Sequence, residues 1–139
     1  MQDPPGRSPL CTSGAVALEF AIIGPVLIML LLGIMVYGGY FLMAHSVQQL
    51  ANDAARAALG GLSDSERQQL AANCLANELP TYGFLSPKLV QLGYADQSQV
   101  MTVNIAYDAS GSPLWALNGI IPMPSSSIVR SASVQVGGF

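Results

Sequence analysis

Hydrophobic positions follow three successive patterns along the chain, and the first is the longest. Residues 20–44 form a nearly unbroken run of Ala, Ile, Leu, Val, Met, Gly and aromatic residues. A helix of this length rises about 37 Å, whereas the hydrocarbon core of a bilayer is about 30 Å thick. A helix buried in a protein core is the alternative, but so small a protein cannot cover such a helix on every side. The run therefore predicts one membrane span.

The second pattern is a helical stripe that continues beyond the apolar run. Its apolar residues recur at steps of three and four, which is the spacing of one helix face. Gly60 and Gly61 then predict the end of that helix. We therefore expect one helix over residues 15–59, with an amphipathic second half. The stripe consists of Val36, Tyr40, Met43, Val47, Leu50, Ala54 and Ala58.

A second, shorter helix is predicted between Ser63 and Pro80. Ser63 and Glu66 have the spacing of a capping box, and Pro80 ends the segment. Cys74 is expected to pack on the apolar side as a small hydrophobic residue. That apolar side consists of Leu70, Cys74, Leu75 and Leu79.

The third pattern is alternation of apolar and polar residues. It predicts strands at residues 90–94, 101–107 and 128–136, with a turn at residues 96–98. Three strands and a covering helix are near the minimum for independent stability. The fold class is therefore α+β: a long N-terminal transmembrane helix continuing into an amphipathic helix, a second short helix and a small three-stranded antiparallel sheet. The apolar loop at residues 114–122 either covers the sheet or contacts a partner, and local cover is favoured.

Charged residues are scarce, and their number and distribution exclude some classes of function. The chain has five Lys and Arg against eight Asp and Glu, so only 9% of its residues are charged, where about a quarter is usual. The basic residues are scattered, which excludes a nucleic-acid interface. The 51% hydrophobic content excludes intrinsic disorder. The chain stays charge-poor beyond Asp53, which hints that this part packs against neighbours.

The residue types needed for catalysis are sparse. His45 is the single histidine, and it lacks a nearby catalytic partner. An interfacial histidine is therefore favoured over a pH sensor. Cys11 and Cys74 are too few for a metal site. We expect no enzyme, no cofactor and no metal, and Cys74 is either buried and inert or paired with another chain.

Glu19 stands at the start of the apolar run, where a carboxylate is costly and often marks function. Its position alone leaves open a harmless interfacial charge. However, Gly14, four mostly small apolar residues, Glu19, Phe20 and a long apolar helix together resemble a type IV prepilin (class III) signal. The resemblance implies that a prepilin peptidase cuts between Gly14 and Ala15. The new cationic amine of Ala15 would then lie one helical turn from a Glu19 carboxylate of a neighbouring subunit, and Glu19 would set the docking register.

Residues 15–25, residues 48–58 and the C-terminal stretch at residues 107–134 resemble TadE-like proteins of tight-adherence (Flp) pilus systems. The resemblance implies a pseudopilin, or minor pilin, that is processed by prepilin peptidase and needed to assemble adhesive type IV pili. Its expected partners are other Tad pilins and pseudopilins and the inner-membrane platform. In this family the Glu19–Phe20 pair belongs to the assembly and recognition region.

The expected organisation has three parts. Residues 1–14 are a prepilin-type leader without regular structure up to Ser13, residues 15–60 are the transmembrane and extended helix, and residues 61–139 are a small extracytoplasmic α+β domain. Arg7 before the span favours a cytoplasmic N-terminus in the bacterial inner membrane. The C-terminal domain is then extracytoplasmic: it lies in the periplasm in the membrane form, or in the pilus after assembly. Because Arg7 is the only basic residue before the cleavage site, an unprocessed single-span envelope scaffold subunit of a secretion machine is the alternative.

Overall fold

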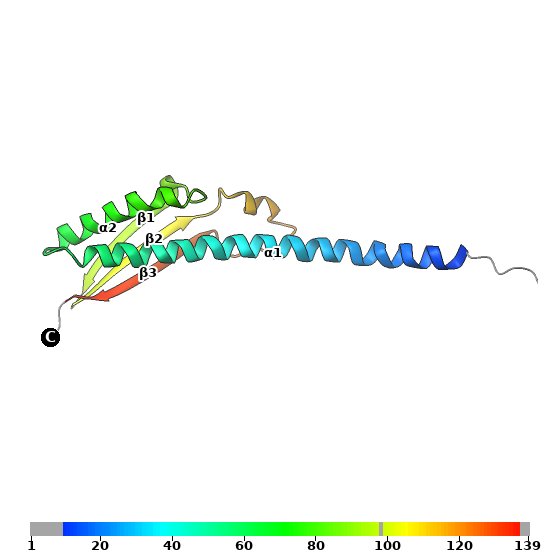
Figure 1. The fold of residues 1–139 in the computed structure, drawn as a ribbon, viewed down its shortest axis with the longest axis horizontal. Helices are drawn as coiled ribbons and strands as arrows, with labels where there is room; N and C mark the ends of the chain where they lie inside the picture. The colour runs from blue at the N-terminus through cyan, green and yellow to red at the C-terminus, as the bar shows by residue number, and fades with distance from the viewer. Residues whose placement is uncertain (1–9, 98, 137–139) are drawn as a thin grey trace, which may run out of the picture. The chain divides into compact units, whose positions relative to one another are not determined.

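The computed structural model describes residues 10–97 and 99–136, and over these residues the predicted α+β class is confirmed (Figure 1). Within them lie two α-helices, three short 3-10 helices and one three-stranded antiparallel sheet. The chain forms two compact units, Met1–Val36 and Tyr37–Phe139. Helix α1 (Leu10–Ala58) contributes residues to both units.

In the first unit the described residues are all helical. Helix α1 begins at Leu10, so the expectation of irregular structure up to Ser13 is wrong for residues 10–13. Residues 10–24 contain no proline. The helix can therefore extend back to Leu10, directly after Pro9. Residues 1–9 of the expected leader lie outside the described residues.

In the second unit, α1 from Tyr37 onward buries one face, as the helical stripe predicts. Every member of the stripe in this unit is buried except Tyr40, which is partly buried against the core. Alanines widen the buried face beyond the predicted stripe, namely Ala44, Ala51 and Ala55. Small side chains on this face allow other elements to pack close to the helix axis, which hydropathy alone does not indicate.

The predicted Ser63 cap is confirmed at the start of α2 (Asp64–Glu78), while the Glu66 side chain bonds one residue before the position that a capping box requires. The Ser63 hydroxyl accepts a hydrogen bond from the Glu66 backbone N–H at 3.3 Å. The Glu66 carboxylate in turn accepts one from the Leu62 backbone N–H at 2.9 Å. Both bonds satisfy backbone donors near the helix start. Ala71 joins Leu75 as a buried residue of α2, whereas the predicted Leu70 and Cys74 are only half-buried.

The sheet consists of β1 (Val90–Gln97), β2 (Val100–Asp108) and β3 (Ser127–Gln135), in the order β1-β2-β3. All three predicted strands are confirmed. The predicted turn is wrong in place, because Asp96 and Gln97 belong to β1 and pair with Met101 and Val100. The short 3-10 helices are η1 (Leu79–Thr81), η2 (Pro87–Leu89) and η3 (Pro113–Leu117).

One face of the sheet joins α1 and α2 in a single hydrophobic core. Met101, Val103 and Ile105 of β2 are fully buried there. The opposite face carries mostly small or uncharged polar side chains, and the charged Asp108 lies at its end, paired with Ser127. The other residues of this face are Gln91, Gly93, Ala95, Gln97, Val100, Thr102, Asn104, Ala106, Val129, Ser131, Ser133 and Gln135.

Candidate processing and assembly site

The four residues predicted for processing and assembly lie on α1 in the first unit: Gly14, Ala15, Glu19 and Phe20. All four are exposed, and Phe20 is 75% accessible. Ala15 and Glu19 are four positions apart, which places them on one helix face about 6 Å apart along the axis. A Cβ atom at Gly14 would meet no atom within 4 Å. The helix therefore leaves the peptide bond after Gly14 and the Glu19 carboxylate uncovered by other described residues.

An apolar hollow lies on the same stretch of helix, beginning at Phe20. A Cβ atom at Gly24 would lie 3.9 Å from the Phe20 ring, and the absence of a side chain at Gly24 leaves room beside that ring. Small residues of this kind let a second helix approach closely in a membrane. The hollow is lined by Phe20, Ala21, Ile23, Gly24, Pro25, Leu27 and Ile28.

The sequence analysis did not single out Ala21 and Gly24 as contact residues. Ala17 and Ala21 are four positions apart and Gly24 follows three positions later, so all three share one helix face. This small-residue spacing is the signal that could have identified them.

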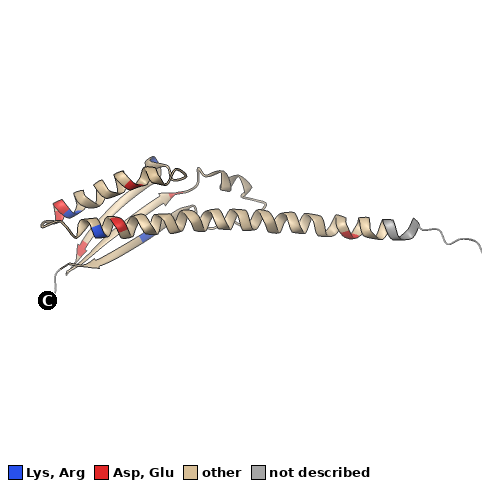
Figure 2. Cartoon of the chain, viewed as in Figure 1, with Lys and Arg blue, Asp and Glu red and all other residues tan. Residues whose placement is uncertain are grey.

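Glu19 carries the last charge on α1 before a long neutral stretch. No Asp, Glu, Lys or Arg occurs over residues 20–52, which appear uniformly tan in Figure 2. Among the described residues the ion pairs join Arg67 to Asp64 and to Asp96, and neither involves Glu19. A carboxylate next to an apolar helix is stabilised when it meets a cation. Glu19 is thus available for a partner from another chain.

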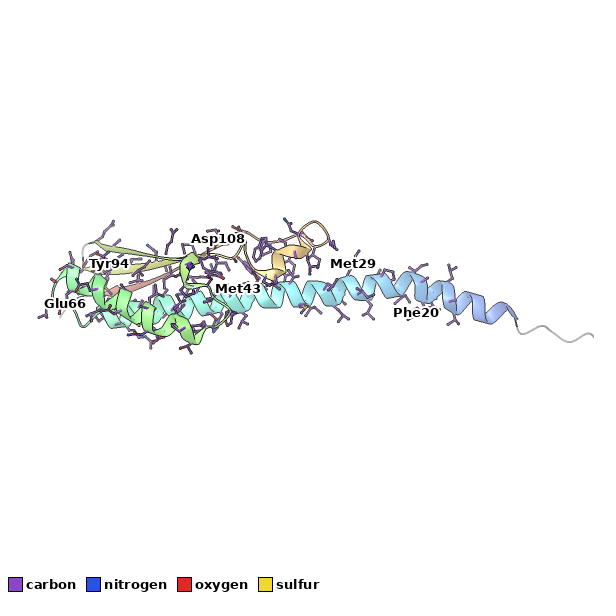
Figure 3. The ribbon with its side chains drawn as sticks, turned by 90° about the horizontal axis from the view of Figure 1, so that it is seen from above. Phe20, Met29, Met43, Glu66, Tyr94 and Asp108 are labelled. Carbon is purple, nitrogen blue, oxygen red and sulfur yellow. The ribbon has the colours of Figure 1, made fainter. Side chains whose placement is uncertain are left out.

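The apolar part of α1 has the character of a membrane span and not of a core helix. Its most apolar window has a mean hydropathy of 2.6, and only 6% of that window is buried. Figure 3 shows Phe20 and Met29 projecting from the helix surface. A core helix of a soluble protein would be mostly buried. Within the described residues this is the one helix long and apolar enough to cross a bilayer, which supports membrane anchoring.

The other residues considered for chemistry are separated in the structure. His45 is exposed and lines a shallow hollow with Phe41 and Arg130. The half-buried Cys74 thiol donates to a Glu78 carboxylate oxygen at 4.0 Å. Burial raises the pKa of the Cys74 thiol, and the negative charges of Glu78 and Asp53 raise it further. Over residues 10–97 and 99–136 no group of three or more His, Cys, Asp or Glu side chains could hold a metal ion.

One protein family matches part of this chain. Residues 14–56 match the family described as TadE-like protein. The suspected TadE-like resemblance is thereby confirmed over this TadE-like segment, which begins at Gly14 and includes Ala15, Glu19 and Phe20. The C-terminal stretch at residues 107–134, which also suggested the family, lies outside the match. No curated protein and no solved structure gave a match to this chain.

The TadE-like segment contains both the exposed part of α1 and most of its buried part. Its first residues carry the possible cleavage site and the Glu19 carboxylate, and its last residues form the core face that packs in the second unit. The match thus falls on the helix that carries all four candidate residues.

Proposed function

We propose that this protein is a pseudopilin, or minor pilin, that takes part in assembling Flp/Tad type IV pili after processing by prepilin peptidase. The observation that carries the proposal is the TadE-like match, which begins at Gly14, directly before the expected cleavage site. The exposed Glu19 five positions later supports it. The protein would act in adhesion through assembly, without catalysing a reaction itself.

Cleavage after Gly14 would remove the first turn of α1 and leave Ala15 as the new N-terminus. The new amine adds a positive charge to the already positive end of the helix dipole. In a bundle of parallel subunits, that end attracts the Glu19 carboxylate of a neighbour when the two helices are offset by about one turn. The hollow beside Phe20 and Gly24 would accept a side chain of the neighbouring helix.

The proposed location follows from the same helix. The apolar segment anchors the protein in the bacterial inner membrane with a cytoplasmic N-terminus, and the second unit lies in the periplasm or, after assembly, in the pilus. The proposed partners are prepilin peptidase, other Tad pilins and pseudopilins, and the inner-membrane platform. The 6% burial of the apolar window leaves the helix surface free for lipid or for these partner helices.

The first test is the mass of the mature chain from a cell that has a prepilin peptidase. A chain that begins at Ala15 is expected, and deleting the peptidase should restore the leader. Gly14→Leu should abolish processing, whereas the control Gly33→Leu should not. A Cβ meets nothing within 4 Å at either glycine, so this comparison separates peptidase recognition from folding. An intact N-terminus in the presence of the peptidase would favour the unprocessed scaffold subunit.

The second test is Glu19→Gln, which keeps the size of the side chain and removes its charge. Co-purification with Tad pilins should fall at least about tenfold, because the partner amine would lose its counter-charge in an apolar setting. Membrane insertion should be unchanged. Glu66→Gln is the matched control, since Glu66 lies on α2, outside the TadE-like segment. Equal recovery of both variants would show that the Glu19 carboxylate is only interfacial.

A further inference from the structure

The loop that joins β2 to β3 packs on α1, and its Leu114 and Trp115 are partly buried against the hydrophobic core. The Tyr37 hydroxyl donates a hydrogen bond to the Pro122 carbonyl at 2.6 Å. The rings of Tyr40 and Trp115 have centroids 6.4 Å apart. A Cβ atom at Gly39 would lie 2.7 Å from a Leu114 methyl carbon, so the loop approaches the helix at a residue without a side chain. The first turns of α1 in the second unit are therefore held by this loop.

The surface formed by this packing is apolar and partly open to solvent, and Arg130 borders it in the hollow beside Phe41. Four large side chains are exposed on it, with accessible fractions of 64% for Phe41, 61% for Ile120, 54% for Leu42 and 47% for Phe84. A groove between Leu42, Phe84 and Leu114 connects α1 to η3 and to the segment after η1. We call Tyr37, Phe41, Leu42, Phe84, Trp115 and Ile120 the apolar collar.

Charge is absent from both segments that supply most of the collar. Residues 20–52 and residues 109–129 contain no Asp, Glu, Lys or Arg, and the ribbon of α1 and of the η3 loop is tan in these stretches (Figure 2). Charged residues collect instead around the turn between α1 and α2, where Arg67 pairs with Asp64 and Asp96. A protein surface that faces water would normally mix charges into such an area.

The length of the span places the collar at the level of the membrane surface. The apolar run begins at Phe20, and residues 20–39 rise about 30 Å as a helix, which matches a hydrocarbon core of about 30 Å. From Tyr37 onward one face of α1 is covered by the loop. Residues 37–44, the last part of the apolar run, therefore lie close to its boundary. Tyrosine and tryptophan, as in Tyr37, Tyr40 and Trp115, are the residue types enriched at that depth.

We propose that the apolar collar seats in the headgroup region of the bilayer, so that the second unit rests on a lipid surface as well as being tethered to it. The occupant of the surface is lipid, because the collar begins where the span ends and carries no charge. The seat would limit the tilt of the second unit relative to the membrane before any assembly. The proposal requires the span but does not depend on a role in pilus assembly.

Trp115 is the only tryptophan of the chain and reports directly on this contact. The full-length protein is placed in phosphatidylcholine vesicles, and flotation verifies insertion. Lipids brominated near the headgroup should quench Trp115 at least twofold more than lipids brominated near the chain ends. Acrylamide in the aqueous phase should quench it at least twofold less than in the same protein in a short-chain detergent. Flotation with strong acrylamide quenching and no lipid quenching would overturn the proposal.

A charge placed in the collar provides the matched comparison. Ile120→Asp alters an exposed side chain, so the fold should persist by circular dichroism, and quenching by the shallow bromines should fall by half or more. Leu62→Asp alters a side chain that is 93% exposed in the turn between α1 and α2, and it should change nothing.

Three other outcomes would also overturn the proposal. Shielding from acrylamide that disappears when the protein is diluted in lipid would identify a second copy as the occupant. Stronger quenching by the deep bromines would place the loop inside the hydrocarbon core. Protein that does not float would lack the span that brings the collar to lipid, whereas loss of pilus assembly with normal quenching would affect only the proposed function.

Discussion

Gly61 lies where the turn between α1 and α2 meets the first turn of α2. A Cβ atom at this position would lie 2.7 Å from both the backbone nitrogen and the Cγ atom of Arg67, and 3.0 Å from its Cα atom. The Gly61 carbonyl also accepts a hydrogen bond from the Arg67 guanidinium at 3.1 Å. The same side chain reaches Asp96 in β1 at 3.1 Å. Gly61→Ala should therefore disturb the point where both helices and the sheet are joined.

The expected cost follows from which atoms are in the way. Forcing an extra carbon into a packed site costs about 1–3 kcal/mol. Here two of the three opposing atoms are backbone atoms, which cannot rotate aside, so the lower end of that range is excluded. We expect about 2 kcal/mol, or a fall in Tm of about 10 °C for a unit of this size. Gly60→Ala is the control, because its new Cβ would have ordinary contacts at 3.6 and 3.7 Å. It should cost less than about 0.5 kcal/mol.

Thermal unfolding of the full chain in detergent micelles measures both variants, with circular dichroism and Trp115 fluorescence as independent signals. Combining Gly61→Ala with Arg67→Ala tests the mechanism, since truncation of Arg67 removes Cγ but leaves the backbone atoms in place. The cost of Gly61→Ala should persist in that background. Equal stability of the Gly60 and Gly61 variants would refute the argument, and full relief by Arg67→Ala would show that only the flexible side chain is in conflict.

Three further predictions concern ionisable groups of the second unit. Because the pKa of the Cys74 thiol is raised by burial and by nearby carboxylates, the pH midpoint of its alkylation by iodoacetamide should lie above that of an exposed cysteine, and Glu78→Gln should lower it. An unchanged midpoint in that variant would contradict this. The Tyr94 hydroxyl is buried without a hydrogen-bond partner among the described residues, so Tyr94→Phe should leave stability unchanged or raise it by up to about 1 kcal/mol in urea unfolding. A clear loss would reveal a partner. The Ser110 backbone N–H, at 2.9 Å, lowers the pKa of Asp108. The resulting stabilisation is fully present above the pKa of an unfolded aspartate, about 3.9, and is lost as the pH falls through the lowered value. Asp108→Asn should therefore flatten the acid limb of the stability curve, and an unchanged limb would argue against this contact.

Local patterns in the sequence predicted most of the secondary structure. The α1 stripe, the Ser63 cap and the three alternating strands each depend on neighbours a few positions away, and the structure confirms them. The start of α1 and the turn after β1 were wrong by several residues. Helix α1 begins directly after Pro9, the last proline before Pro25, whereas the turn after β1 is moved because Asp96 and Gln97 pair with β2.

The candidate site and the collar likewise include residues that the sequence could predict and residues that it could not. The positions of Gly14 and Glu19 relative to the apolar run could be read directly, because they lie within one short stretch of sequence. The hollow at Gly24 could have been found from small-residue spacing. The collar could not, since its parts come from α1, from the segment after η1 and from the β2–β3 loop.

By itself the sequence determined a single apolar helix, a capped second helix, an alternating sheet and a TadE-like segment. These features depend on periodicity and short spacing, which act within one stretch of chain. Only the tertiary structure showed that the apolar loop lies against α1, because the Tyr37–Pro122 hydrogen bond joins residues 85 positions apart. Only it showed that Gly61 is required for space at Arg67. Such contacts depend on packing among elements distant in sequence, for which hydropathy and spacing provide no signal.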